Sequence, residues 1–218
     1  MSYQIAIDGP AGAGKSTIAK KVAKEKGFIY VDTGAMYRAM AYYLLTKRVD
    51  PADSEAIEKN CQDADISIRY ENGEQVVLLN GENVNSVIRS EEVGNMASAS
   101  SPNPIVRERL TLLQKELASK NNVVMDGRDI GTCVLPNADV KVFLTASSKV
   151  RAKRRFDELS AKGIACDIGQ IEADIIKRDE QDMTREIAPL KQADDAVLVD
   201  SSDMTIDEVV RAILGLCR

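Results

Sequence analysis

The stretch from residue 9 to residue 16, Gly-Pro-Ala-Gly-Ala-Gly-Lys-Ser, constrains this chain more than any other. It has the spacing G-x-x-x-x-G-K-[ST], follows an apolar run at residues 3–8 and precedes a helix-like segment at residues 17–26. A glycine-rich loop between a strand and a helix brings backbone N–H groups close to a phosphate chain, and the helix N-terminus adds partial positive charge. The sequence therefore predicts a nucleoside triphosphate site on an α/β fold.

Two side chains of this loop have chemical roles that follow from the motif. Lys15 is expected to reach the β- and γ-phosphates of the nucleoside triphosphate, and the Ser16 hydroxyl is expected to bind Mg²⁺. The predicted ATP-binding residues are Gly9, Pro10, Ala11, Gly12, Ala13, Gly14, Lys15, Ser16 and Thr17.

Strand-like and helix-like segments alternate along most of the chain, which predicts a parallel sheet with helices on both faces. The expected strands are residues 3–8, 28–31, 122–126, 139–144 and 196–200. The expected helices are residues 15–26, 34–47, 53–62, 104–119, 147–161, 168–181 and 205–216. The fold class is therefore α/β, with a P-loop NTPase-type parallel five-stranded sheet flanked by helices.

One segment departs from this alternation. Residues 65–70 alternate apolar and polar side chains, as a half-buried strand does, and the dipeptides Asn72-Gly73 and Asn80-Gly81 are strong hairpin signals. We expect a small inserted antiparallel subdomain at residues 62–100, in a core of residues 1–61 and 101–218. Residues 97–102, Ala-Ser-Ala-Ser-Ser-Pro, are interpreted as a break between elements.

Composition excludes several classes of function. The net charge of −5 argues against a nucleic-acid binder, and no apolar run approaches the roughly 20 residues that span a membrane. The first residues lack the features of a signal peptide, and the four cysteines are scattered without a C-x-x-C pair, so we expect a cytoplasmic protein with reduced thiols. The chain has no histidine, which excludes an imidazole base.

Three further groups of charged residues lie where chemistry is expected. Asp32 to Arg38 follow the second strand, where Thr33 is able to cap the next helix and Arg38 is either a phosphate ligand or an ordinary exposed arginine. Asp126 ends an apolar strand and is followed by Arg128 and Asp129, at the sheet edge where open α/β folds bind ligands. A third group lies on a predicted helix, where Arg178, Asp182 and Arg185 fall on one face; a solvated, self-paired face is the alternative.

Together these motifs resemble the bacterial cytidylate kinase family, in the nucleoside monophosphate kinase group of P-loop kinases. The resemblance rests on residues 7–16, 32–38, 126–132 and 178–190, and the insert matches the enlarged monophosphate-binding insert of these enzymes. The family often has Asp-Ser-Gly where this chain has Asp32-Thr33-Gly34.

The resemblance implies that ATP and CMP or dCMP are the substrates and that a helical lid spans about residues 151–190. It implies that Arg38, Arg128 and Arg185 hold the acceptor phosphate and that Asp182 contacts the sugar. Ser98, Arg107 and Asp129 would read the cytosine, and Thr33 would join them in binding CMP; Ser100 and Ser101 are alternatives to Ser98. The expected catalytic residues are Lys15, Asp126, Arg128, Arg178 and Arg185, with Ser16 on Mg²⁺ and Asp126 acting on it through a water molecule. We expect a monomer.

Two other functions stay open at this level. One is a kinase for another small acceptor, such as UMP, AMP or shikimate. The other is a nucleotide-dependent switch or ATPase, although the chain has no Asn-Lys-x-Asp motif of the kind that reads guanine in GTPase switches.

Overall fold

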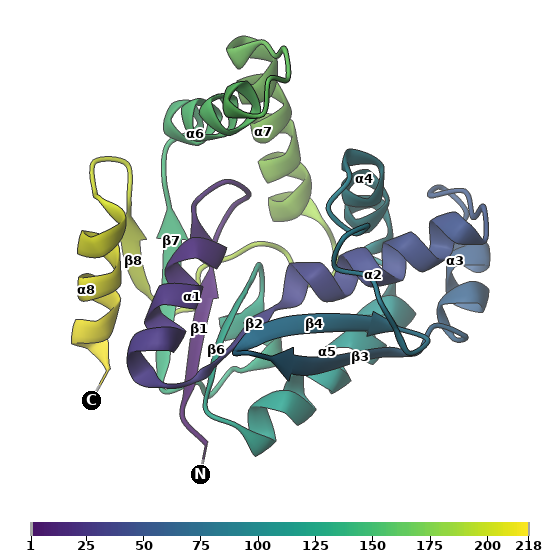
Figure 1. Cartoon of the computed structure of the whole chain (residues 1–218), viewed down its shortest axis with the longest axis horizontal. Coiled ribbons are helices and arrows are strands. Elements are labelled where there is room, and N and C mark those ends of the chain that lie inside the picture. The colour runs from purple at the N-terminus through teal and green to yellow at the C-terminus, as the bar shows by residue number, and fades with distance from the viewer. Residues whose placement is uncertain (1, 218) are drawn as a thin grey trace. The chain divides into compact units, whose positions relative to one another are not determined.

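A computed structural model describes residues 2–217 (Figure 1). Its larger sheet has five strands in the order β2-β6-β1-β7-β8, and its smaller sheet has the order β3-β4-β5. The predicted α/β fold with a five-stranded sheet and a small antiparallel insert is therefore confirmed. The chain forms two compact units: one contains residue 2 and residues 29–122, and the other contains residues 3–28 and 123–217.

The unit of residues 3–28 and 123–217 carries the glycine-rich loop. Its strands are β1 (Gln4–Asp8), β6 (Val123–Gly127), β7 (Val140–Thr145) and β8 (Val197–Asp200). Its helices are α1 (Lys15–Lys26), the π-helical turn η1 (Ile130–Val134), α6 (Ser148–Ala161), α7 (Ile168–Thr184) and α8 (Ile206–Leu216). Figure 1 shows α6 beside α7 and α8 beside α1.

The four strands of this unit pair in parallel, and β1, β6 and β7 are mainly apolar and buried, as expected of a parallel sheet covered on both faces, whereas the edge strand β8 is mostly exposed. Ile5 is paired in register with Val124 of β6 and Val140 of β7. Side chains of β1, such as Ile5 and Ile7, are fully buried. The register brings the carboxyl ends of β1 and β6 together, where the loop begins and where Asp126 lies.

The unit of residues 29–122 contains β2 (Ile29–Asp32), α2 (Thr33–Thr46) and α3 (Ser54–Cys61), then the meander β3 (Ile66–Glu71), β4 (Glu74–Leu79) and β5 (Glu82–Asn83). The helices α4 (Glu91–Ser100) and α5 (Pro104–Lys120) complete it. Asn72 and Gly73 have φ of 52° and 82°, and Asn80 and Gly81 have φ of 51° and 83°. Two successive positive φ values are what a tight two-residue hairpin turn requires, so both Asn-Gly predictions are confirmed.

Two expectations about local structure are wrong. Residues 97–100 do not break the chain but form the last turn of α4, a helix that was not among those expected from the sequence, and the break begins at Ser101. Asp32, rather than Thr33, caps α2, because its side chain accepts the Ala35 N–H at 2.9 Å; Thr33 is the first residue of the helix.

No helix within residues 2–217 combines the length and the apolar character needed to cross a membrane.

Candidate active site

The loop between β1 and α1 is shaped by glycines that no other residue could replace without strain. A Cβ on Gly9 would lie 1.9 Å from the backbone oxygen of Leu144 in β7, so only glycine allows the loop to leave the sheet there. Gly12 has φ +76°, in the left-handed region that glycine adopts readily. No side chain within residues 2–217 caps the N-terminus of α1, so its first N–H groups stay available to an anion.

Lys15 lies inside this loop with its side chain almost fully buried. Its Nζ donates a hydrogen bond to the Pro10 carbonyl at 2.7 Å. Burial, and then the positive charge of Arg128, lower the pKa of Lys15 to about 7, while Asp126 and Asp8 oppose that shift. The folded chain therefore holds an ammonium that is poorly solvated, and a bound phosphate would restore its charge.

Ser16 and Asp126, predicted from separate motifs, lie together. Ser16 Oγ donates to Asp126 Oδ2 at 3.0 Å, and the Asp126 side chain is buried at the end of β6. A hydroxyl and a carboxylate at the mouth of a phosphate-binding loop are hard oxygen donors of the kind that Mg²⁺ prefers, so these residues fit that ion.

The predicted charged residues of β6 and α7 also gather in this unit. Arg128 Nε donates to Asp182 Oδ2 at 2.8 Å. Arg185 lies just beyond the end of α7, at 3.6 Å from Asp129 (Nη2 to Oδ1) and 3.9 Å from Asp182 (Nη1 to Oδ1). The spacing that suggested one helix face thus brings Asp182 and Arg185 together, although Arg185 is not part of the helix.

Arg178 completes this cluster of positive charge. Burial, and then the charge of Arg128, lower the pKa of Arg178. No group in residues 2–217 forms a hydrogen bond with its buried Nε atom. A half-buried cation whose buried Nε has no partner, close enough to another cation to be destabilised by it, is an arrangement that an anionic ligand would stabilise.

Sequence reasoning missed Asp8, which holds the loop that follows Asp129. Asp8 Oδ1 accepts the N–H of Ile130 and Oδ2 accepts the N–H of Gly131, both at 2.7 Å. Burial raises the pKa of Asp8 to about 6, although the two backbone N–H groups oppose that shift. An aspartate at the end of an apolar strand was the available signal, but its partners lie more than a hundred residues away.

The other unit carries the remaining predicted residues. Arg38 in α2 donates to the Ile88 carbonyl at 3.3 Å, and Arg107 in α5 is buried with its guanidinium 5.9 Å from the centre of the Tyr37 ring. Thr33 is buried at the start of α2, and Ser98 is half-buried on α4. The hydroxyls of Ser100 and Ser101 donate to the carbonyls of Met96 and Ser98.

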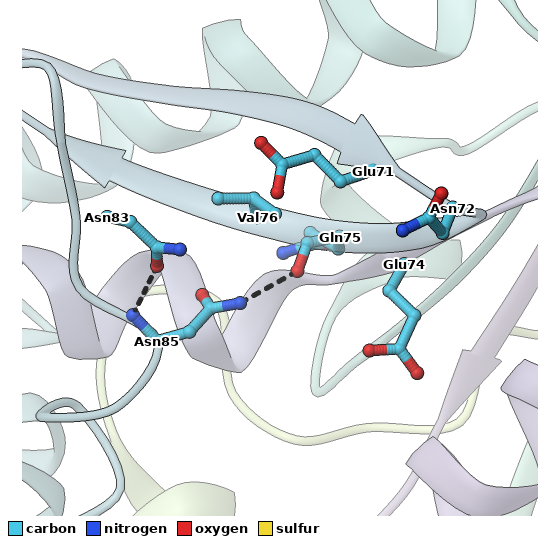
Figure 2. A pocket seen from close by; sticks show the side chains of 7 residues that line it. All are labelled: Glu71, Asn72, Glu74, Gln75, Val76, Asn83 and Asn85. Atoms are coloured by element: carbon cyan, nitrogen blue, oxygen red, sulfur yellow. Dashed lines mark hydrogen bonds between the residues drawn. The ribbon is translucent and has the colours of Figure 1, made fainter.

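A pocket of about 510 Å³ lies on the small sheet of this unit (Figure 2). Its lining consists of carboxylates, amides and one valine: Glu71, Asn72, Glu74, Gln75, Val76, Asn83 and Asn85. The backbone N–H of Asn85 donates a hydrogen bond to Asn83 Oδ1, and its side-chain Nδ2 donates one to the Gln75 carbonyl, as the dashed lines in Figure 2 show. None of the predicted binding residues lines this pocket, and its acidic side chains do not suit a phosphate.

Comparison with known proteins agrees with this geometry. A sequence model of the family described as cytidylate kinase matches residues 5–218. The cytidylate kinase of Caldicellulosiruptor bescii is 51% identical over 212 residues, which cover 97% of this chain and 94% of that protein. The cytidylate kinase of Shouchella clausii is 50% identical over 216 residues, covering 99% and 96%.

A solved structure of an uncharacterized protein from Eubacterium ventriosum is 15% identical with a TM-score of 0.52, and the match covers 99% of this chain and 97% of that one. This second kind of likeness concerns the fold alone.

Proposed function

The chain belongs to the cytidylate kinase family, and from that premise we propose that it transfers the γ-phosphoryl group of ATP to CMP or dCMP, giving ADP and CDP or dCDP. The observation that carries the chemistry is a group of cations, the buried Lys15 with the half-buried Arg128 and Arg178, in which the Nε of Arg178 has no partner in residues 2–217. Such a set is suited to the charge that develops on a phosphoryl group in transfer.

The donor side of the proposal rests on the loop. Its backbone N–H groups and Lys15 hold the phosphates of ATP, and Lys15 exchanges its bond with the Pro10 carbonyl for the phosphate oxygens. Mg²⁺, when bound, would neutralise charge on those oxygens, and Ser16 with Asp126 would hold it, Asp126 through a water molecule. These residues position the donor and leave little covalent chemistry to the protein.

The acceptor side needs no general base, because a phosphate monoester is already anionic at neutral pH. We propose that Arg38, Arg128 and Arg185 hold the acceptor phosphate and that Asp182 contacts the sugar. Arg178 and Arg185 stabilise the transferring group and help to exclude water, which would otherwise hydrolyse ATP.

Recognition of the base is assigned to Ser98, Arg107 and Asp129, with Thr33 as a further contact. A carboxylate accepts from the amino group of cytosine, whereas arginine and serine donate to its ring nitrogen and carbonyl. Uracil would leave such groups unpaired. Among the three candidate serines, Ser98 is favoured because the hydroxyls of Ser100 and Ser101 already donate to backbone carbonyls.

A panel of acceptors tests the function directly. With ATP and Mg²⁺, we expect faster ADP release on CMP and dCMP than on UMP, AMP or shikimate. Faster turnover of one of the last three would replace the assigned acceptor. ADP release that needs no acceptor and yields no phosphorylated product would instead indicate a switch or ATPase.

The role of Asp129 is tested by the ratio of CMP to UMP turnover. Asp129→Ala should lower kcat/KM for CMP and leave that for UMP nearly unchanged, reducing the preference by about 10-fold or more, because the buried carboxylate favours the amino group. An unchanged ratio would remove Asp129 from base recognition.

The proposal also includes the lid at about residues 151–190, the insert at residues 62–100 as the monophosphate-binding subdomain, a cytoplasmic location and a monomeric state. Light scattering should give the chain mass of 23.8 kDa. Twice that mass would contradict the monomer.

A further inference from the structure

Arg151, near the start of α6, is a buried arginine that the proposed reaction does not use. Its Nε donates to the Ala146 carbonyl at 2.8 Å, and its Nη1 donates to the Ala11 carbonyl at 3.0 Å. Its guanidinium also forms a two-pronged ion pair with Asp179 of α7, with Nη1 to Oδ1 at 3.1 Å and Nη2 to Oδ2 at 2.6 Å. All three nitrogens therefore have protein partners, and the side chain lies in the unit that carries the glycine-rich loop.

We infer that Arg151 is a positioning residue that sets the conformation of the phosphate-binding loop, and that Asp179 holds Arg151 in place for this task. The Ala11 carbonyl and the Gly12 N–H belong to one planar trans peptide, so they point in opposite directions. The bond from Arg151 draws the carbonyl toward α6 and thereby turns the Gly12 N–H away from α6, to the side on which loop N–H groups converge on phosphate.

The packing of the loop against α6 supports this reading independently of the hydrogen bonds. A Cβ on Gly12 would lie 3.4 Å from the Cβ of Arg151, so the loop backbone rests directly on the arginine stem. Arg154, one turn further along α6, lies 3.5 Å from the Ala13 carbonyl through its Nη1 and donates to the Ser201 carbonyl at 2.8 Å. Two arginines of one helix thus contact alternate carbonyls of the loop.

The ion pair between Arg151 and Asp179 also connects α6 with α7, the helix that carries Arg178. Asp179 follows Arg178 on α7 and lies one turn before Asp182, the partner of Arg128. Arg151 therefore links the loop that holds the donor phosphates to the helix that carries Arg178, one of the two residues assigned to the transferring group. This role rests on the proposed function, since it deepens how the same site binds ATP.

The test uses four variants of the full chain and a matched control. We would titrate ADP into each variant by calorimetry without CMP, and separately measure KM for ATP and for CMP. Arg151→Gln and Asp179→Asn should each weaken ADP binding by roughly 10-fold or more, as expected for the loss of a charge-assisted bond. Arg151→Lys should weaken it less, because an ammonium keeps one of the contacts.

Coupling between the two residues gives a second readout. The double variant Arg151→Gln/Asp179→Asn should bind ADP only about as weakly as Arg151→Gln alone, because the pair acts as one unit. KM for ATP should rise while KM for CMP stays unchanged. The control is Lys153→Gln, which breaks an exposed ion pair with Asp157 on the same helix and should leave ADP affinity unchanged.

Circular dichroism identifies variants that remain folded, and the isosteric Asp179→Asn decides the matter if Arg151→Gln does not fold. ADP affinity within about twofold of wild type in folded Asp179→Asn would overturn the inference, as would additive losses in the double variant. A wild-type chain that binds ADP but does not phosphorylate CMP would contradict the proposed function and leave the ADP comparison intact.

Discussion

The Lys15 side chain is buried, and its burial disfavours the charged ammonium form. The proposed phosphate ligand, however, needs that positive charge. Burial and the positive charge of Arg128 lower the pKa of Lys15 to about 7, so the protein without ligand holds a poorly solvated ammonium in the loop. This arrangement is typical of a residue retained for transition-state charge rather than for stability.

Replacing this lysine should separate activity from folding. Lys15→Ala is expected to lower kcat by about 100- to 1000-fold, because a donor aimed at developing charge is lost. Its melting temperature should equal or exceed that of wild type, because a poorly solvated ammonium is removed. Steady-state assays and thermal unfolding measure both, with exposed Lys24→Ala on the same helix as the control. Loss of the fold in Lys15→Ala would contradict this account.

Asp8 imposes a dependence of stability on pH whose sign can be worked out. Its pKa is about 6 in the folded chain against 3.8 for an ordinary aspartate, so the folded chain binds this proton more tightly than the unfolded chain. The free energy of unfolding therefore falls as pH rises from about 4 to about 6. The full contribution is about 3 kcal/mol, at about 1.4 kcal/mol per pH unit.

Chemical denaturation across that range, in wild type and Asp8→Asn, measures this contribution. The asparagine lowers the free energy of unfolding because its amide NH₂ faces a backbone N–H. This loss is the same at every pH, since the amide does not titrate. Subtracting one curve from the other should leave a decline for wild type between about pH 4 and 6. A flat difference would mean that Asp8 titrates like an exposed carboxyl.

At the scale of elements, the contact between the glycine-rich loop and β7 limits which residues the loop tolerates. Gly9→Ala should lower the free energy of unfolding by about 3 kcal/mol or more, because its Cβ would overlap the Leu144 carbonyl oxygen. That oxygen belongs to the backbone of β7, so the overlap is relieved only by shifting the backbone. Gly27→Ala is the matched control: Gly27 also has positive φ, at +66°, but no atom of the described residues lies within 4 Å of a Cβ there. That variant should cost about 1 kcal/mol. Urea unfolding compares the two, and equal losses would contradict the argument.

Strands and turns were predictable from sequence because their signals are local. Buried strands read as short apolar runs, and the two Asn-Gly pairs specify their own backbone angles. The helix α4 also has local signals, namely its cap Ser90 and the acidic residues Glu91 and Glu92 in its first turn. It was not predicted because the alanines and serines at its end were interpreted as a break between elements. The burial of Val93 and Met96 in the core stabilises the helical conformation of this segment.

Other features depend on interactions that no local pattern encodes. The π-helical turn η1 begins where Asp8 accepts two backbone N–H groups from a segment far along the sequence. Residues that the motifs singled out do contact one another, as Ser16 does with Asp126 and Arg128 with Asp182, but the motifs gave no indication of Asp8. The contacts of Arg151 with the Ala11 carbonyl and with Asp179 likewise join segments that are far apart in the sequence, so no local pattern predicted them.

At the scale of the whole molecule, the two units carry different parts of the proposed chemistry. Every residue assigned to ATP belongs to the unit of residues 3–28 and 123–217, whereas Thr33, Arg38, Ser98 and Arg107 belong to the other. A substitution in the second group should therefore affect one substrate and not the other.

Arg38→Ala tests this division. KM for CMP should rise by about 10-fold or more through loss of a charge-assisted contact with phosphate, while the affinity for ADP measured without CMP stays within about twofold of wild type. Arg69→Ala, an exposed arginine of the same unit that pairs with Glu71, serves as the control. A parallel loss of ADP affinity in Arg38→Ala would show that the two functions are not separable in this way.

The pairing of β1 also has a consequence for how the chain is made. β1 is synthesised before its partner strands, because the residues paired with it, such as Val123 of β6 and Val140 of β7, are more than a hundred residues further along the chain. At about 5–20 residues per second, translation leaves this apolar strand without its neighbours for on the order of 10 s. The strand that leads into the phosphate-binding loop therefore completes its place in the sheet only after β6 and β7 have been synthesised.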